Sequence, residues 1–323
     1  MTPVIPCNLC NGKDTEIIAA RDREKNPMQT VICTGCGLVW TDPRPSAEET
    51  KKFYAQEYRQ KYKSTFQPKL KHVYRDMKRA VARYERIKPY LQPGFRVLDI
   101  GAGAGFFPYV VKQNGFEISG LEPNEGYARY ANDEFNLDVK VGFIQDINFE
   151  VEAFDIVTLN HVLEHLEDPG AGLARIFDWL KPGGYLNVEV PNIEATYHAP
   201  GNKFHLAHLY TFNPENLKRL GEKAGFAVTD LKIMPGTEHI NYIFQKPSQR
   251  IHAGPVDSEF RIDGNYNRIR NILDAHTPLS HYLSATPYTR FIKKNSGYLK
   301  EQIAIRGFAS GRELADNLIA RNI

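Results

Sequence analysis

The sequence predicts an α/β protein: a doubly wound, mostly parallel sheet with an antiparallel edge, preceded by a small metal-binding ribbon and followed by a helical extension. Three observations predict this class. Strand-like apolar runs alternate with amphipathic segments from residue 95 to residue 190, as in a parallel sheet covered by helices. A glycine-rich turn follows the first run, and two C-x-x-C pairs stand near the N-terminus. At 323 residues, the chain is long enough for about two domains.

Composition and charge exclude several classes of function. The chain has 41 Lys and Arg against 38 Asp and Glu, and a net charge of +3 gives no support to nucleic-acid or membrane binding through bulk charge. No apolar run reaches the roughly 18 residues of a membrane span, and the first residues lack the layout of a signal peptide. We therefore expect a cytoplasmic protein with no membrane span and no nucleic-acid partner.

The four cysteines of the chain form the first candidate site. Cys7 and Cys10 make one C-x-x-C pair, and Cys33 and Cys36 make the other. Two thiolates from one tight turn can bind one metal ion, so the pairs predict a structural Zn²⁺ site with a closed four-thiolate shell. Disulfides are the alternative, which a reducing cytoplasm disfavours. Zinc would supply much of the folding energy of so short a segment, on the order of 10 kcal/mol.

The first expected elements belong to the ribbon and to two helices. Glu16–Ala20 and Gln29–Ile32 are typical of short strands. An S-x-x-E capping box at Ser46 predicts a helix through about Tyr62, and apolar residues spaced by three and four predict a second helix after Pro68. Both helices are expected to pack on the next domain or to act as a lid.

The main sheet and its helices are expected between residues 95 and 245. Asn213 as a cap and Pro214 at the first helical position predict one helix. The other expected elements are the strands Phe95–Ile100, Phe116–Leu121, Val139–Val141, Phe154–Leu159 and Tyr185–Val190, the helices Tyr127–Phe135 and Ala171–Leu180, and an antiparallel edge pair at Phe226–Ile233 and His239–Gln245.

These elements divide the chain into four expected segments. They are a zinc ribbon at 1–45, a helical linker or lid at 46–92, a catalytic domain at 93–247 and a helical extension at 248–323. The extension is polar to basic, has a capping box at Ser310 and Glu313, and contains no chemical motif. It could cover the acceptor site, dock onto a partner enzyme or form a homodimer contact.

Polar and glycine residues at the ends of the predicted strands indicate a nucleotide site. Gly101, Gly103 and Gly105 follow the first strand, where backbone amides can approach a ligand closely. A nicotinamide fingerprint would place its third glycine at position 106, which is Phe106. The other strand ends carry Glu122, placed for ribose hydroxyls, Asp146, placed for an adenine amino group, and Asn160.

Together these motifs resemble the class I S-adenosylmethionine-dependent methyltransferases. The resemblance is carried by VLDIGAGAG (97–105), LEPN around Glu122, QDI around Asp146, FDIVTLNHVLEHLEDP (154–169), KPGG, VPN, HLYTF and AGF. The chain is most similar to the bacterial subgroup with an N-terminal four-cysteine zinc ribbon, which includes sugar C-methyltransferases and proteins of polysaccharide tailoring. The resemblance covers about residues 7–247 and implies a Rossmann-like fold with S-adenosylmethionine as cofactor.

The resemblance also implies which residues contact the cofactor. Asp99, Gly101, Ala102, Gly103 and Gly105 would line its methionine and ribose side, Glu122 would bind the ribose hydroxyls, Asp146 the adenine, and Asn160 would neighbour the sulfonium.

Two histidines are candidate bases, because an acceptor hydroxyl or carbon acid must lose a proton. In the ribbon-bearing sugar C-methyltransferases, one active-site histidine ends an N-V-x-x-H run and another lies in a Y-x-E-H-L-x-Y run. His165 matches the first and His208 the second. Ala207 and His205 stand where that group has its glutamate and tyrosine, so the apparatus for C-methylation is incomplete and O-methylation is favoured.

A second resemblance suggests a divalent cation at the active site. Ubiquinone-type O-methyltransferases and small-RNA 2′-O-methyltransferases carry E-x-x-E-H and a later histidine, which together can hold such a cation. Glu164 and His165 match this run, and His161 replaces its first glutamate. A bound cation would help an acceptor oxygen to ionise. The alternative is that His161 and Glu164 only cap and brace a helix that begins there.

The predicted function is methyl transfer from S-adenosylmethionine to an oxygen of a sugar or glycan-type small acceptor, with His208, His165 and Glu164 as catalytic residues. Alternatives within this class are C-methylation of a nucleotide-linked keto-sugar and O-methylation of a phenolic or quinone metabolite. A different alternative is a ribbon that directs the enzyme to RNA. The mixed charge of the ribbon disfavours RNA, because it forms no stripe of phosphate-binding residues.

Overall fold

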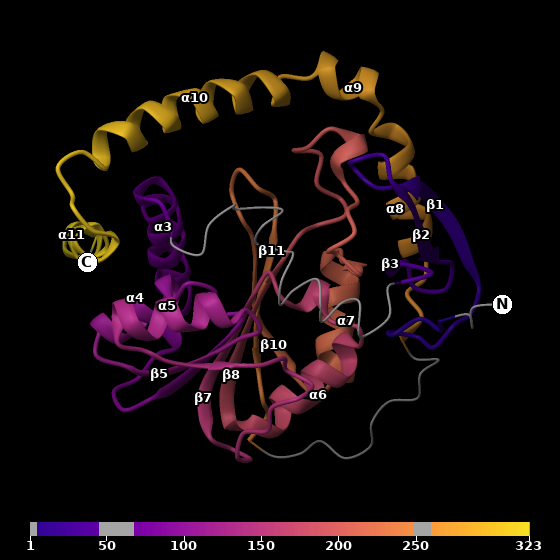
Figure 1. Ribbon diagram of the computed structural model, residues 1–323. Coiled ribbons are helices and arrows are strands. Elements are labelled where there is room, and N and C mark those ends of the chain that lie inside the picture. Colours follow the sequence, from indigo (N-terminus) through magenta and orange to yellow (C-terminus); the bar gives the residue numbers. More distant parts are fainter. Residues whose placement is uncertain (1–4, 45–67, 249–259, 323) are drawn as a thin grey trace. The chain divides into compact units, whose positions relative to one another are not determined.

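The computed structural model describes residues 5–44, 68–248 and 260–322 (Figure 1). The chain forms two compact units: unit 1 takes residues 1–45 and 159–290, and unit 2 takes residues 46–158 and 291–323. Each unit is described separately below. The four-segment division expected from the sequence stays a prediction. The expected helix from Ser46 to Tyr62 lies outside the described residues.

The strands form two sheets, with orders β1-β2-β3-β9 and β10-β11-β8-β7-β4-β5-β6. Their bounds are β1 (Thr15–Arg21), β2 (Pro27–Cys33), β3 (Val39–Thr41), β4 (Arg96–Ile100), β5 (Glu117–Glu122), β6 (Asp138–Val141), β7 (Phe154–Asn160), β8 (Leu180–Val190), β9 (Tyr210–Thr211), β10 (Ala227–Ile233) and β11 (Ile240–Gln245). The predicted α/β class with an antiparallel edge is confirmed, since β4, β5 and β6 pair in parallel and β8, β11 and β10 pair antiparallel.

The helices predicted after Pro68, near Tyr127–Phe135, near Ala171–Leu180 and after Asn213 are confirmed, whereas α4 was not predicted. Their bounds are α3 (Leu70–Ile87), α4 (Phe106–Gln113), α5 (Glu125–Phe135), α6 (Pro169–Trp179), α7 (Pro214–Lys223), α8 (Asn265–Ala275), α9 (Pro278–Leu283), α10 (Thr286–Ala304) and α11 (Gly311–Asn322). Asn213 caps α7 as predicted: its side chain accepts from the Asn216 N–H, and the Asn216 side chain accepts from the Asn213 N–H. In the described part of the chain, no helix is long and apolar enough to cross a membrane.

The largest error in an expected boundary concerns the start of β8. The sequence placed the end of a helix at Leu180 and the start of the next strand at Tyr185, but β8 begins at Leu180. The reason is backbone pairing: the Gly183 N–H donates to the Lys246 carbonyl, and the Lys246 N–H donates to the Gly184 carbonyl, both at 2.8 Å. This pairing extends the strand through a segment whose local residues favour a turn.

In unit 2, the C-terminal helix α11 lies against α3 (Figure 1). The apolar stripe predicted for α3 is buried, including Val73 and Met77 at 0% exposure. The hydroxyl of Tyr109 on α4 donates to Asp316 of α11. Arg312 donates to the Glu134 carbonyl at 2.7 Å. These contacts give the last helix a structural role in unit 2, which the sequence did not reveal.

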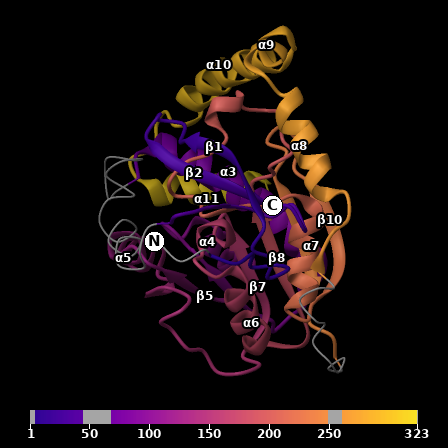
Figure 2. The same ribbon diagram turned by 90° about the vertical axis from the view of Figure 1, so that its right-hand side faces the viewer.

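In unit 1, the ribbon shares its sheet with a strand from much later in the chain. Figures 1 and 2 show β1 beside β2, and the short β3 pairs with β9 through Val39 with Thr211 and Trp40 with Tyr210. Helix α8 packs Ile269 against Ile32 and Val39 of the ribbon. The two predicted ribbon strands are confirmed. The strands β3 and β9 and the packing of α8 were not predicted.

Candidate active site and metal sites

The four cysteines lie together in the ribbon and are free thiols. Cys7 Sγ lies 3.4 Å from Cys36 Sγ, and Cys10 Sγ lies 3.5 Å from Cys33 Sγ. All four sulfur atoms lie within 4.8 Å of one another and belong to buried residues. Four ligands at Zn–S distances of about 2.3 Å stand about 3.8 Å apart in a tetrahedron, so this set fits zinc.

The turns that present these thiols each contain a residue with left-handed backbone. Asn11 and Gly37, which follow the two pairs, have φ of 56° and 76°. A Cβ at Gly37 would lie 2.8 Å from Nδ2 of Asn265. That amide donates to the Cys36 carbonyl at 2.8 Å, so α8 holds the second turn of the ribbon.

The glycines in the turn after β4 share a left-handed backbone, but Gly103 and Gly105 have different surroundings. Gly101, Gly103 and Gly105 all have positive φ, at 75°, 56° and 80°. A Cβ at Gly105 would lie 2.6 Å from Ala131 Cβ and 2.7 Å from Leu137 Cδ1, which is too close for either contact. A Cβ at Gly103 would meet no heavy atom within 4 Å. Gly105 is therefore required for packing on α5, whereas Gly103 borders open space where a ligand can approach the backbone.

Of the three acidic residues predicted at this site, Glu122 braces the glycine turn. Glu122 is buried and accepts from the N–H groups of Gly103 at 2.8 Å and Asn124 at 2.9 Å. Asp99, also buried, accepts from the Thr158 hydroxyl at 2.5 Å. Asp146 is exposed, on the loop after β6. The structure thus brings Asp99, Glu122 and the glycine turn together in unit 2, and their cofactor contacts stay predictions.

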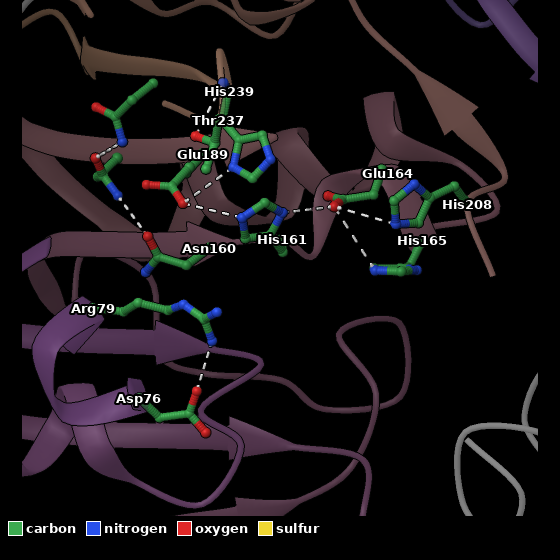
Figure 3. Close-up of polar contacts among 12 residues, drawn as sticks. Asp76, Arg79, Asn160, His161, Glu164, His165, Glu189, His208, Thr237 and His239 are labelled. Carbon is green, nitrogen blue, oxygen red and sulfur yellow. Dashed lines mark hydrogen bonds and ion pairs between the residues drawn. The ribbon is translucent and has the colours of Figure 1, made fainter. Parts of the chain in front are cut away.

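In unit 1, Glu164 is the centre of the candidate catalytic cluster (Figure 3). It is 0% exposed, and its Oε1 lies 3.2 Å from His161 Nδ1, 3.8 Å from His165 Nε2 and 3.9 Å from His208 Nε2. Its second oxygen, Oε2, has no hydrogen-bond partner among the described residues. A buried carboxylate oxygen without a partner is costly, which indicates that a ligand completes this cluster.

The ring of His165 is oriented by a backbone carbonyl. Its Nδ1 lies 2.5 Å from the Ala207 carbonyl oxygen, so Nδ1 carries the proton and donates it. The other ring nitrogen, Nε2, lies on the side that faces Glu164, 3.8 Å from Oε1. A ring nitrogen that donates to a backbone carbonyl, as Nδ1 does here, is typical of metal-binding histidines, because that bond fixes the orientation of the ring.

The local electrostatics separate the roles of the histidines. Burial, followed by the neighbouring His165 and His205, lowers the pKa of His208 well below its ordinary value. Burial also lowers the pKa of His205, to about 4. Burial opposes the charged form of His161 too, but its bonds to Glu164 and Glu189 raise its pKa to about 9. His161 is therefore charged and His208 neutral at pH 7.

Glu164 stays ionised beside them. Its burial alone would raise its pKa, but the hydrogen bond from His161 and the nearby His165 outweigh burial and lower the pKa below its ordinary value. The carboxylate can therefore stabilise positive charge on a neighbouring imidazole or cation.

Two sequence expectations about this cluster need correction. Glu164 does not lie at the start of an α-helix: Leu163–His165 is a single 3₁₀ turn, and α6 begins only at Pro169, capped by the side chain of Asp168. The group that could hold a cation is Glu164, His165 and His208, in which His208 takes the place expected for His161.

The sequence missed Glu189 and His239, which lie beside His161 in unit 1 (Figure 3). Glu189 belongs to β8 and His239 directly precedes β11. The sequence offered only a weak indication of these two residues: Glu189 stands close to the end of one predicted strand, and His239 is the first residue of another. Asn160 accepts a long 3.4 Å bond from Asn187.

Comparison with known proteins identifies the class. Residues 70–231, half of the chain, match a family described as a methyltransferase domain. The chain belongs to this methyltransferase family, and the predicted class of enzyme is confirmed.

The similar proteins are methyltransferases by name, and one of them is named for its pathway. A probable S-adenosylmethionine-dependent methyltransferase of Mycolicibacterium smegmatis is 28% identical over 42% of this chain and 54% of its own length. A ubiquinone biosynthesis O-methyltransferase of Bradyrhizobium sp. is 34% identical over 31% of this chain and 41% of its own length. A solved methyltransferase from Methanosarcina mazei has a TM-score of 0.46 and 18% identity, covering 51% of this chain and 99% of that chain. The chain thus spans about half or less of these curated relatives.

Proposed function

We propose that the protein transfers a methyl group from S-adenosylmethionine to a hydroxyl group of a small polar acceptor of the sugar or glycan type. The observation that carries this proposal is the cluster of Glu164, His165 and His208, in which a buried carboxylate with an unpartnered oxygen lies beside a neutral imidazole. Such a cluster suits deprotonation of a weakly acidic hydroxyl.

The residues of unit 2 would hold the cofactor. The open space at Gly103 fits a ligand that approaches the backbone, and Glu122 lies next to it with a carboxylate that can accept from ribose hydroxyls. When bound, S-adenosylmethionine supplies an electrophilic methyl carbon on a positively charged sulfur. The glycine turn and Glu122 contribute orientation, which is the main requirement of an in-line displacement.

His208 would accept the proton of the acceptor hydroxyl. Because its pKa is lowered, the imidazole keeps a lone pair at pH 7, and Glu164 Oε1 at 3.9 Å from Nε2 would stabilise the imidazolium that forms. The absence of a glutamate at Ala207 favours this O-methylation over C-methylation of a keto-sugar.

A divalent cation fits the same cluster. The ligand atoms of Glu164, His165 and His208 lie within 4.8 Å of one another, and the bond of His165 to Ala207 orients its other nitrogen as a metal ligand requires. A cation there would lower the pKa of a bound acceptor hydroxyl. A chelator too weak to remove the ribbon zinc should then abolish turnover, and full activity in its presence would contradict cation assistance.

The test of the function is His208→Ala. The variant should bind S-adenosylhomocysteine as the wild type does in calorimetry, yet lose turnover by about 100-fold. His198→Ala is the matched control, since His198 lies in unit 1 outside the three groups that could hold a metal. Normal turnover by His208→Ala would overturn the assignment of the base.

A second candidate acceptor is a phenolic or quinone metabolite, favoured by the similarity to the ubiquinone biosynthesis O-methyltransferase. Nucleotide sugars and catechols assayed side by side, with transfer of a labelled methyl group as readout, distinguish the two. A salt titration of binding to bulk RNA tests the alternative of RNA as substrate, which predicts tight and strongly salt-dependent binding.

A further inference from the structure

A second group of possible metal ligands lies in unit 1 on the far side of His161 from Glu164 (Figure 3). His161 Nε2 lies 3.0 Å from Glu189 Oε1, and His239 Nδ1 lies 4.0 Å from the same oxygen. The ring centroids of His161 and His239 lie 4.6 Å apart, and the rings pack edge to face. All three ligand atoms lie within 4.8 Å of one another.

Backbone contacts fix each of these three residues. The N–H of His161 donates to the Glu189 carbonyl at 2.8 Å, and the φ of His161 is 59°, a left-handed conformation that is uncommon for a non-glycine residue. The carbonyl of His239 accepts from Met234 at 2.8 Å, across the turn between β10 and β11. Antiparallel pairing of Asn241 with Glu189 then brings His239 to this carboxylate.

The chemistry of the set selects a class of cation. Two imidazoles and one carboxylate suit borderline metals such as zinc, cobalt, nickel and iron, whereas magnesium and calcium prefer oxygen ligands alone. Three ligands also leave coordination positions open. Glu189 is buried, so its negative charge gains from a partner that carries two positive charges.

The spacing requires only small adjustments. Ligands at about 2.1 Å from a tetrahedral metal stand about 3.4 Å apart. The separations of 3.0 Å and 4.0 Å from Glu189 Oε1 differ from this by less than 1 Å, and the ligand nitrogens of His161 and His239 lie within 4.8 Å of each other. A cation would replace the proton on Nε2 of His161, which is released to water, and Nδ1 would keep its proton and its bond to Glu164.

We propose that His161, Glu189 and His239 form a divalent transition-metal site, separate from the four cysteines and from the group of Glu164, His165 and His208. In this site, the metal fixes the ring of His161, and the Nδ1–H of that ring in turn orients Glu164. His161 is thus a positioning residue that links the site to the candidate catalytic cluster. Metal binding here does not depend on the proposed methyl transfer.

The experiment measures cobalt binding to the full chain with zinc in the ribbon. Equilibrium dialysis against Co²⁺, with cobalt and zinc determined per chain, is carried out on His208→Ala, which disables the neighbouring group. We expect one bound cobalt per chain, with the absorption spectrum of nitrogen and oxygen ligation and no thiolate charge-transfer band. Addition of His239→Ala, or of Glu189→Gln, should remove this cobalt, whereas His198→Ala should leave it.

Circular dichroism and ribbon zinc content show whether each variant is folded, and Glu189→Gln preserves shape if His239→Ala does not fold. The proposal is overturned if His208→Ala binds no cobalt, or if His239→Ala and Glu189→Gln bind as much cobalt as their parent. Loss of turnover in His208→Ala with cobalt still bound separates this site from the proposed catalytic function.

Discussion

Replacing Gly105 by alanine tests how the glycine turn after β4 is built. With φ at +80°, the residue is left-handed, and a Cβ there would lie 2.7 Å from Leu137 Cδ1 and 3.2 Å from Ala131 Cα. The left-handed backbone costs about 1–2 kcal/mol with a side chain, and overlap with packed atoms adds about 1–3 kcal/mol. Gly105→Ala should therefore lower the free energy of unfolding by about 2–5 kcal/mol.

Gly103→Ala is the matched variant, because the backbone is also left-handed, at +56°, but the added Cβ meets no heavy atom within 4 Å. Its stability loss should be only the backbone cost of about 1–2 kcal/mol. Its main effect should be on cofactor affinity, since the Cβ would occupy the space open to a ligand. Urea titration measures the stabilities, and calorimetry with S-adenosylhomocysteine measures the affinities. Equal stability losses in the two variants would refute the packing argument, and wild-type affinity in Gly103→Ala would refute the ligand argument.

Three further predictions concern other parts of the chain. Tyr109→Phe removes the hydroxyl that donates to Asp316, so it should cost about 1–2 kcal/mol and expose the C-terminal helix to faster hydrogen exchange; unchanged exchange would contradict this docking. Gly221→Ala should destabilise α7 in thermal unfolding although alanine favours helices, because the added Cβ would lie 2.7 Å from Cζ of Phe244; a more stable variant would show that the ring yields. His161 binds its proton more tightly when folded, with a pKa of about 9 against 6.5, so in the cation-free chain its stabilisation is complete below pH 6.5 and lost as pH rises through 9. Urea titrations across this range should give a falling free energy of unfolding in the wild type and a flatter profile in His161→Gln.

Features set by neighbouring residues could be predicted from the sequence. The apolar stripe of α3 and the cap formed by Asn213 before Pro214 each depend on a few consecutive turns of chain, and each is confirmed. The clustering of the four cysteines, predicted from the spacing within each pair, is also confirmed. The grouping of His165 with His208 was also suggested, because both follow strands of the same predicted sheet.

Features that depend on distant pairing could not be predicted. Glu189 and His239 meet only because β8 and β11 pair in one particular antiparallel register. The residues around Gly183 favour a turn, but their backbone pairs with Lys246, so β8 begins earlier than the sequence predicted. The bond of Asp99 to the Thr158 hydroxyl likewise depends on a strand that lies far along the chain.

The pairing of β3 with β9 has a consequence for biosynthesis. Both C-x-x-C turns are complete once Cys36 has left the ribosome, but the sheet of the ribbon receives its last strand only after Thr211 has been translated. Until then, the edge of β3 that faces away from β2 has no strand beside it in the nascent chain and is open to pairing with another polypeptide. Premature termination before Tyr210 would therefore yield fragments that contain all four cysteines yet aggregate through this edge.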